Sequence, residues 1–324
     1  MHQKKYLFEI DRCIRGFGQE ELSTLLPEAK SISKAFSIFE GKLEKNEIDR
    51  LGLTKTVYEI IISSSEDNFI NTIENVDWKE FYNRDFSVRK HRRFNCSFKE
   101  REIADVIWVA LKKQGLNPKT NLKGASTELF VIKEAGIIWL CKKIWQRESF
   151  EERMPNNRPA LHPSSIHPKI ARAMINLSGI KSGFLVDPFC GSGGIIIEAG
   201  LLGYKVKGID IDGAMLGRAK KNLDFFGIDA ILEKKDARLF DEDCDLIVTD
   251  PPYGKNTKLV GSINELYTTF LKNAMNHCDV VVMIFPDFVN ENKIVKDANA
   301  RIDKQFSYYI HKSLTRHICR LVPL

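Results

Sequence analysis

The sequence predicts an α/β protein, in which a Rossmann-like sheet with helices on both faces follows a smaller α+β region. Beyond residue 160, short apolar segments that suit buried parallel strands, such as 184–186 and 246–248, alternate with helical segments. A glycine-rich turn follows the first of these strands. Before residue 63, two or three strand-like segments and one helical segment suit a small α+β module.

Length and composition limit the class of protein. A chain of 324 residues suits two or three domains. No charged-then-apolar leader and no apolar run of about 18 residues is present, so we expect a cytoplasmic protein without a membrane span. The seven cysteines are odd in number and form no C-x-x-C pair, which argues against a disulfide framework and against a zinc site. We therefore expect no metal.

The first segment, residues 1–62, contains strand-like patterns at 6–10 and 35–40 and a helical pattern at 19–26. It carries no motif that indicates chemistry. A polar run at 63–67 suits a loop or a helix cap, and it marks the edge of a predicted subdomain.

The second segment, residues 63–146, is richer in basic residues. Residues 1–83 carry 11 Lys and Arg against 15 Asp and Glu, whereas residues 84–150 carry 15 against 7. Residues 85–94 place aromatic and basic side chains together on a strand and the turn after it. An amphipathic helix at 100–113 and a hairpin at 127–133 and 135–143 follow. The basic residues form either a solvated face or a surface that contacts phosphates.

Residues 147–160 are charged and contain prolines, which predicts a linker before a domain at 161–324. His162 and His167 lack the spacing and the acidic or cysteine neighbours of metal ligands, so capping and turn roles are expected. A helix at 169–177 leads to the first strand of the predicted sheet.

The glycine-rich turn follows Asp187 and includes Cys190, Gly191, Gly193 and Gly194. Glycines let the main chain approach a ligand closely, and the helix that follows offers free N–H groups at its N-terminus. A second strand ends at Asp210, where an acid commonly binds ribose hydroxyls. The spacing of the dinucleotide fingerprint G-x-G-x-x-G is not met, which disfavours a dinucleotide.

Further along the chain, we expect a helix at 215–226 closed by Gly227 and a strand at 230–233. A helix at 264–276, a buried strand at 280–285 and an antiparallel hairpin at 306–320 complete the predicted fold.

The loop Thr249–Gly254 follows the strand at 246–248, and Pro251 and Pro252 end that strand because neither has an N–H to donate. The prolines stiffen the loop, which holds the Asp250 carboxylate, the adjacent carbonyls and the Tyr253 ring in one arrangement. An aromatic face beside a carboxylate and a carbonyl suits a flat ring that bears an amine. Taken alone, the loop is equally consistent with a simple strand-ending turn.

Four segments, 187–194, 208–212, 235–237 and 249–254, resemble in that order the class I S-adenosylmethionine-dependent methyltransferases that act on exocyclic amines. More closely, they resemble the archaeal and eukaryotic tRNA guanine-10 N2-methyltransferases that carry an N-terminal THUMP domain. The resemblance is close over residues 159–324 and looser over residues 1–150.

This resemblance implies S-adenosylmethionine as cofactor, tRNA as substrate and a THUMP-like RNA-binding region. It also leaves open whether a small activator protein, which the eukaryotic relatives use, is needed. The implied cofactor contacts are Asp187, Cys190, Gly191, Gly193, Asp210, Ile211, Asp236, Ala237 and Asp250. The implied catalytic residues are Asp250, Pro251 and Tyr253, and the implied RNA contacts are Arg89, Lys90, Arg92 and Arg93.

The expected reaction is methyl transfer to the N2 amine of a guanosine in tRNA, with guanosine 10 favoured and one or two methyl groups added. Three alternatives stay open at this point: a different guanosine, such as tRNA position 6 or one in rRNA; a DNA adenine methyltransferase; and a non-catalytic RNA-binding protein. The basic N-terminal segment argues against DNA, and the four acids Asp187, Asp210, Asp236 and Asp250 argue against a loss of catalysis.

Overall fold

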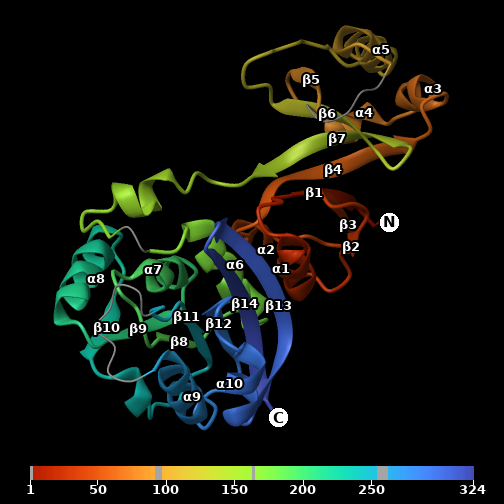
Figure 1. Ribbon diagram of the computed structural model, residues 1–324. Coiled ribbons are helices and arrows are strands. Elements are labelled where there is room, and N and C mark those ends of the chain that lie inside the picture. Colours follow the sequence, from red (N-terminus) through yellow and green to blue (C-terminus); the bar gives the residue numbers. More distant parts are fainter. Residues whose placement is uncertain (1–2, 92–96, 163–164, 254–261) are drawn as a thin grey trace. The chain divides into compact units, whose positions relative to one another are not determined.

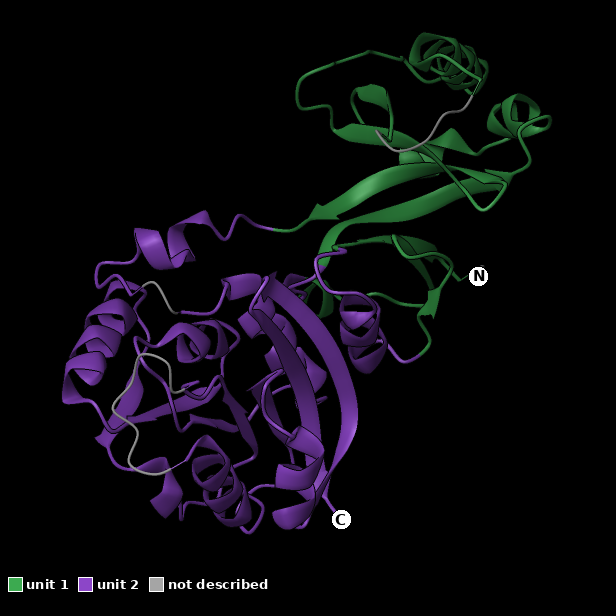
Figure 2. Cartoon of the chain, viewed as in Figure 1, with its two compact units in different colours: residues 1–11, 28–48, 54–147 green, residues 12–27, 49–53, 148–324 purple. Residues whose placement is uncertain are grey.

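The computed structural model describes residues 3–91, 97–162, 165–253 and 262–324 (Figure 1). The chain forms two compact units (Figure 2). Unit 1 comprises residues 1–11, 28–48 and 54–147, and unit 2 comprises residues 12–27, 49–53 and 148–324. Among the described residues, no helix has the length and apolar character needed to cross a membrane.

In unit 1, the described residues form a seven-stranded sheet in the order β2-β3-β1-β4-β7-β6-β5. The edge strand β5 runs parallel to β6, and the other neighbours pair antiparallel. The strands are β1 (Lys5–Ile10), β2 (Lys30–Ser31), β3 (Phe36–Glu40), β4 (Thr54–Ser64), β5 (Phe86–Lys90), β6 (Thr127–Glu134) and β7 (Ile137–Gln146). The helices are α2 (Lys45–Asp49), which crosses the unit boundary, α3 (Phe69–Glu74), α4 (Trp78–Phe81) and α5 (Glu100–Lys113).

The core of unit 1 lies between α3, α5 and one face of this sheet. Phe69, Trp78, Ile107 and Leu129 are fully buried members of it. The predicted helix at 100–113 is confirmed, as are the β6–β7 hairpin and the strands near 6–10 and 35–40. Amphipathic spacing predicted α5 well because its apolar side chains recur every three or four residues.

In unit 2, the described residues form a second seven-stranded sheet in the order β10-β9-β8-β11-β12-β14-β13. The first five strands are parallel, and β14 pairs antiparallel with both β12 and β13. The strands are β8 (Phe184–Asp187), β9 (Lys205–Asp210), β10 (Ala230–Lys234), β11 (Leu246–Thr249), β12 (Val281–Pro286), β13 (Ala300–His311) and β14 (Leu314–Pro323). The helices are α1 (Phe17–Leu25), α6 (Pro168–Leu177), α7 (Gly194–Leu201), α8 (Gly213–Phe225), α9 (Ile263–Ala274) and α10 (Glu291–Asp297), with short 3-10 helices η1 (Glu151–Arg153), η2 (Pro155–Asn157) and η3 (Ala237–Leu239).

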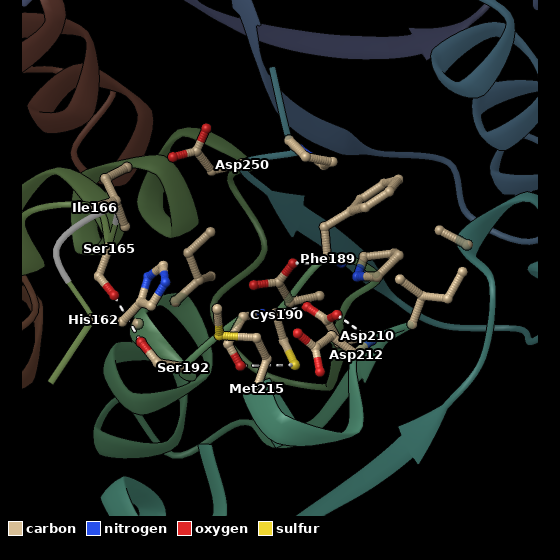
Figure 3. Close-up of a pocket in the computed structure, with 18 of the residues that line it drawn as sticks. His162, Ser165, Ile166, Phe189, Cys190, Ser192, Asp210, Asp212, Met215 and Asp250 are labelled. Carbon is tan, nitrogen blue, oxygen red and sulfur yellow. Dashed lines mark hydrogen bonds between the residues drawn. The ribbon is translucent and has the colours of Figure 1, made fainter. Parts of the chain in front are cut away.

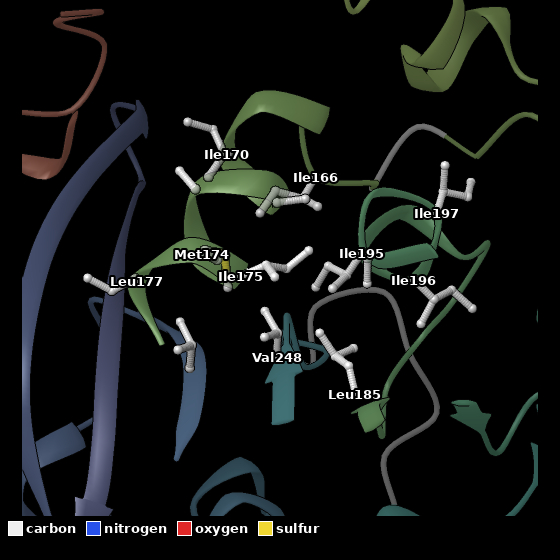
Figure 4. Packing of buried hydrophobic residues seen from close by; sticks show 14 of the residues in the cluster. Ile166, Ile170, Met174, Ile175, Leu177, Leu185, Ile195, Ile196, Ile197 and Val248 are labelled. Carbon is white, nitrogen blue, oxygen red and sulfur yellow. The ribbon is translucent and has the colours of Figure 1, made fainter. Parts of the chain in front are cut away.

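Both faces of the central parallel strands β8, β11 and β12 are buried, which explains why their sequences are mostly apolar. Leu185 and Val248 pack with α6 and α7 on one face (Figure 4). Their neighbours Val186 and Ile247 pack with α9 on the other face. The mixed α/β sheet that the sequence predicts is therefore present.

Several predicted elements of unit 2 differ in extent from the structure. The C-terminal hairpin is antiparallel and at the sheet edge, as predicted, but its strands are longer than the predicted range of 306–320. The seven-residue helix α10 was not predicted. It begins at an Asn290 cap, whose side chain accepts from the N–H of Lys293. Gly227 has a φ of +66° after α8, which confirms its predicted role at the end of that helix.

The two units do not coincide with the predicted domain ranges. Residues 12–27 and 49–53 belong to unit 2, although the sequence groups them with a subdomain at 1–62. The buried Glu21 of α1 accepts hydrogen bonds from the N–H groups of Gly52 and Leu53 and from the Asn176 side chain of α6. These bonds join three distant stretches of the chain into one unit.

The predicted linker also differs from what the structure contains. Arg153 and Arg158 are buried in unit 2. Arg153 donates from Nε to the fully buried Glu198 at 2.7 Å, and the guanidinium of Arg153 lies 4.8 Å from the centre of the Phe150 ring. Proline and charge predict a linker, but Arg153 pairs with Glu198 within the unit, and Nε of Arg158 donates to the carbonyl of Arg153.

Candidate active site

The glycine turn between β8 and α7 brings main chain to the edge of a cavity. Gly191 has a φ of +53°, and a side chain added there would meet open space. Gly193 has a φ of +88° and precedes the first residue of α7. A side chain at Gly208 in β9 would lie only 2.8 Å from the Cys190 sulfur, so this glycine makes room for the turn.

Asp210, at the end of β9, links that strand to the glycine turn. Its Oδ2 accepts from the N–H of Gly191 at 2.9 Å, and its Oδ1 accepts from the N–H of Asp212 at 2.8 Å. Each carboxylate oxygen can accept a second hydrogen bond, so Asp210 keeps capacity for a ligand. Burial raises the pKa of Asp210, and these N–H groups oppose that effect.

Asp187 joins the ends of β8 and β11. Its Oδ1 accepts from the Thr249 hydroxyl at 2.7 Å and from the N–H of Phe189 at 3.2 Å. The residue is 1% exposed, and burial raises the pKa of Asp187 to about 7. A protonated Asp187 is therefore a populated state near neutral pH.

Asp236, after β10, caps η3. Its carboxylate accepts from the N–H of Arg238 at 2.9 Å and forms an ion pair with the guanidinium of the same residue. These bonds lower the pKa of Asp236. The adjacent Ala237 is buried.

A cavity of about 280 Å³ lies over the carboxyl ends of the parallel strands, where open α/β sheets bind ligands (Figure 3). Its lining includes most of the predicted cofactor contacts: Asp187, Cys190, Gly191, Asp210, Ile211, Asp236, Ala237 and Asp250. Gly193 is not part of the lining. Asp250 lies apart from Asp210 and Asp212 across the cavity in Figure 3.

Among the described residues, each oxygen of the Asp250 carboxylate accepts one hydrogen bond. The Tyr253 hydroxyl donates to Oδ1, and Nη1 of Arg316 donates to Oδ2 at 3.2 Å. Burial raises the pKa of Asp250, while the charge of Arg316 lowers it. The loop is fixed further by the Tyr267 hydroxyl, which donates to the carbonyl of Pro252 at 2.9 Å. The predicted grouping of Asp250 and Tyr253 therefore exists, whereas Pro251 and Tyr253 are not among the residues that line the cavity.

The predicted RNA contacts belong to unit 1, on and after the edge strand β5. Nη2 of Arg89 donates to the carbonyl of Leu122 at 2.8 Å, and Nζ of Lys90 donates to the carbonyl of Phe98 at 3.1 Å. Arg92 and Arg93 lie outside the described residues, as does Gly254 of the catalytic loop.

Sequence reasoning missed several residues at this site. Arg316 reaches Asp250 because β14 pairs with β12 so that Arg316 lies opposite Pro286, and no local pattern encodes that register. His162, predicted only as a capping or turn residue, lines the cavity, as does Ser165, which shares a 2.7 Å hydrogen bond with Ser192. His167 does cap α6, as predicted, by accepting from the N–H of Lys169.

Comparison with known proteins connects this site to a family. A family model described as RMKL-like, methyltransferase domain, matches residues 155–317. A second model, described as DNA methylase, matches residues 33–221 and ends before Asp250. Among solved structures, TrmN from Thermus thermophilus superposes with a TM-score of 0.57 at 22% identity, over 99% of this chain and 100% of that chain. A putative methyltransferase, SMU.472, complexed with SAH, gives 0.53 at 14% identity over 100% and 99% of the two chains, which supports the fold.

Curated relatives are more similar in sequence. The tRNA (guanine(10)-N2)-dimethyltransferase of Methanothermobacter thermautotrophicus is 34% identical over 83% of this chain and 82% of that relative. The enzyme of the same name from Pyrococcus abyssi is 32% identical over 86% of each chain. A tRNA (guanine(6)-N2)-methyltransferase from Methanocaldococcus jannaschii is 25% identical over 90% and 87%. With its class I methyltransferase sheet and identity above 30% across most of both chains, this protein belongs to the family of the tRNA (guanine(10)-N2)-dimethyltransferases.

Proposed function

We propose that the protein transfers one or two methyl groups from S-adenosylmethionine to the exocyclic N2 amine of guanosine 10 in tRNA. The observation that carries this proposal is the position of Asp250, which lines the cavity and belongs to the Asp-Pro-Pro-Tyr loop. The names of the relatives supply the base and the tRNA position.

The residues of the cavity fit S-adenosylmethionine. Five aspartates line it, whereas Arg238 is its only arginine or lysine among the described residues and is paired with Asp236. This excess of carboxylates favours a ligand with a positive charge, such as a sulfonium. Ile211 is 63% exposed and offers an apolar surface beside Asp210. Asp210 would hold the ribose hydroxyls, and Asp236 and Ala237 the adenine.

The chemistry that the chain must supply is limited, because bound S-adenosylmethionine provides a methyl group on a positively charged leaving group. Asp250 and the Pro251 carbonyl accept hydrogen bonds from the target amine and stabilise the positive charge that develops on its nitrogen. Burial raises the pKa of Asp250, which makes this carboxylate a better acceptor of the proton that the amine loses. Tyr253 supplies a stacking surface for a base that has left its helix.

The tRNA would be held through the basic residues of unit 1. Residues 84–150 carry a net charge of +8, whereas residues 161–324 carry 21 Lys and Arg against 19 Asp and Glu. Arg89, Lys90, Arg92 and Arg93 supply part of this charge, and they would contact phosphates near the single-stranded acceptor end, as in a THUMP domain.

The test is to incubate the protein alone with tRNA transcripts and labelled S-adenosylmethionine, then to identify the product by nuclease digestion and mass spectrometry. We expect N2-methylated guanosine, and we expect it to be lost from a transcript with adenosine at position 10. Retention of the product in that transcript would favour another guanosine, such as position 6, and methylated adenine would overturn the choice of base. If a small activator is required, the protein alone will bind the cofactor but will not turn over.

Asp250→Ala tests the catalytic role directly. Turnover should fall at least a hundredfold, which corresponds to about 3 kcal/mol of transition-state stabilisation. Affinity for S-adenosylmethionine, measured by calorimetry, should change little in this variant. Near-normal turnover would show that Asp250 is not the residue that binds the amine, and an unmutated protein that fails to bind the cofactor would favour a non-catalytic RNA-binding protein.

A further inference from the structure

Arg316 contacts both functional side chains of the catalytic loop. Its Nη1 lies 3.2 Å from Oδ2 of Asp250, and its guanidinium carbon lies 5.1 Å from the centre of the Tyr253 ring. Both side chains of the ion pair are largely buried, at 15% exposure for Arg316 and 13% for Asp250. Arg316 therefore belongs to the place where the target base must bind if Asp250 accepts from its amine.

The donors of Arg316 are not all used. Its Nε is buried, and within the described part of the chain it has no hydrogen-bond partner. A buried donor without a partner destabilises a protein unless a ligand or water satisfies it. The residues on either side of Arg316 in β14 are nonetheless anchored. The N–H of Thr315 donates to the Asp287 carboxylate, and Nδ1 of His317 lies 2.9 Å from Oε1 of Glu291. The strand is thus anchored on both sides of Arg316, while the guanidinium itself has donor capacity to spare.

Asp250 and Arg316 together present two acceptors followed by a donor: Oδ1, Oδ2 and then Nη1. The Watson–Crick edge of guanine has the complementary order, with the N2 amine and N1–H as donors and O6 as acceptor. The Tyr253 hydroxyl already donates to Oδ1, but a carboxylate oxygen accepts two hydrogen bonds. Guanine can therefore bind with its N2 amine at Oδ1, N1–H at Oδ2 and O6 at Arg316.

Adenine does not match this order. Its N6 amine is a donor, but the next atom along its edge, N1, is an acceptor and would face the second carboxylate oxygen. Two acceptors in contact in a buried site repel each other and leave polar groups unsatisfied. The carboxylate and the arginine therefore provide a physical reason for guanine to be preferred over adenine by this loop.

We propose that Arg316 is a specificity-determining residue, which selects guanine by donating a hydrogen bond to O6 of the target base. This inference rests on the proposed function, because it assumes that the N2 amine of guanine is the methyl acceptor. It also implies that the Arg316–Asp250 contact loosens or widens to admit the base.

The test compares guanine with 6-thioguanine at the target position of the tRNA. The analogue keeps the N2 amine and N1–H but replaces O6 with sulfur, which is a weaker acceptor. For the unmutated protein, kcat/KM should be at least about tenfold lower with 6-thioguanine. In Arg316→Met, which keeps apolar contact with the Tyr253 ring but has no donor, kcat/KM for guanine should fall and the guanine to 6-thioguanine ratio should approach one. Arg316→Lys should restore part of the ratio because it keeps a donor.

Arg320→Met is the matched control. Arg320 lies on the same strand, and it pairs with Asp303 instead of the catalytic loop. This variant should keep the ratio of the unmutated protein. A full ratio in Arg316→Met, or no discrimination by the unmutated protein, would overturn the assignment of Arg316 while N2 methylation itself stands. If the unmutated protein gives no N2-methylguanosine, the proposed function fails first.

Discussion

Asp210 holds two parts of the cofactor cavity together and would also bind the ribose. We expect Asp210→Ala to weaken S-adenosylmethionine binding roughly ten- to hundredfold, since hydrogen bonds to a charged group contribute about 1.5–3 kcal/mol. Part of this loss reflects the freed N–H groups of Gly191 and Asp212. Calorimetric titration measures the effect, and Asp229→Ala, a change at an exposed acid away from the cavity, is the control. Unchanged affinity in Asp210→Ala would place the ribose elsewhere.

Asp187 makes a pH-dependent contribution to stability. Burial raises the pKa of Asp187 to about 7 from its ordinary 3.8, so between these values the folded protein binds a proton more tightly than the unfolded chain. This contribution therefore makes stability fall as the pH rises from about 4 to about 7. Asp187→Asn should remove it, because the amide oxygen still accepts from Thr249 and Phe189 and the amide does not titrate.

Urea unfolding of both proteins at several pH values measures this effect. The free energy of unfolding of Asp187→Asn, relative to the unmutated protein, should rise between about pH 4 and pH 7 by at most about 4 kcal/mol. Taking the difference removes most of the contributions of Asp210 and Asp250, whose pKa values are also raised; what remains is their charge interaction with Asp187 itself. A constant difference across this range would show that Asp187 stays ionised in the folded protein.

Single residues of the site divide into those that sequence predicts and those that it does not. Asp187, Asp210 and Asp250 each follow an apolar strand, and parallel strands end at the same edge of a sheet, so their meeting at one cavity follows from local patterns. Arg316 is different, because its contact with Asp250 spans 66 residues and depends on the pairing of β14 with β12. Long-range register of this kind leaves no mark in the local sequence.

At the scale of elements, a buried charge cluster fixes α7 beneath the glycine turn. Glu198 of α7 is fully buried and accepts from Arg153 of η1 at 2.7 Å and from Arg172 of α6 at 2.9 Å. Burial raises the pKa of Glu198, and the two arginines oppose that effect. The carboxylate therefore determines how η1 and α6 lie against α7.

Glu198→Gln should lower the free energy of unfolding by about 3–5 kcal/mol, because it removes the buried carboxylate between two buried arginines and turns an amide N–H group toward a donor. The half-exposed Glu148, which pairs with both arginines, keeps part of their charge compensated. Urea unfolding measures the change. Glu233→Gln is the control, since Glu233 pairs with Lys207 and its side chain is 40% exposed; its effect should stay within about 1 kcal/mol. Equal effects of the two substitutions would show that the cluster contributes little to stability.

The segment at 147–160 has the composition of a linker, but part of its charge belongs to this buried cluster. Arginines, glutamates and prolines in a short run are typical of exposed connections. Here, however, Arg153 pairs with Glu198, which lies 45 residues further along the chain in α7. The other residues of α7 are apolar or glycine. A single buried acid in an apolar helix is the one local signal that could have indicated a buried partner.

At the scale of the whole molecule, unit 2 depends on residues that precede its main segment. A fragment beginning at residue 159 would lack Arg153, which pairs with Glu198, and α1, which supplies the buried Glu21. Such a fragment would leave buried charges and polar groups unsatisfied. The roles of the two units are therefore best separated by substitutions in the full chain.

Binding of tRNA should fall steeply as salt rises, because Lys and Arg that neutralise phosphates release counterions. Replacing Arg89, Lys90, Arg92 and Arg93 by Ala should flatten the slope of log affinity against log salt by up to about 3 units, at about 0.7 per contact on a single strand. Cofactor affinity should not change, since the substituted residues belong to unit 1 and the cavity belongs to unit 2.

Two comparisons decide whether the loss of tRNA affinity is specific to these four residues. The control variant replaces four exposed lysines of unit 1 by Ala, which removes the same charge: Lys30, Lys34, Lys42 and Lys45. If the four basic residues on and after β5 contact the acceptor end, removing the 3′ end of the tRNA should weaken binding to the unmutated protein and add little to the loss in the variant. Equal slopes for the two quadruple variants would mean that net charge alone attracts the tRNA. An unchanged slope in the first would mean that these residues form only a solvated face, and the phosphate contacts would have to come from other basic residues.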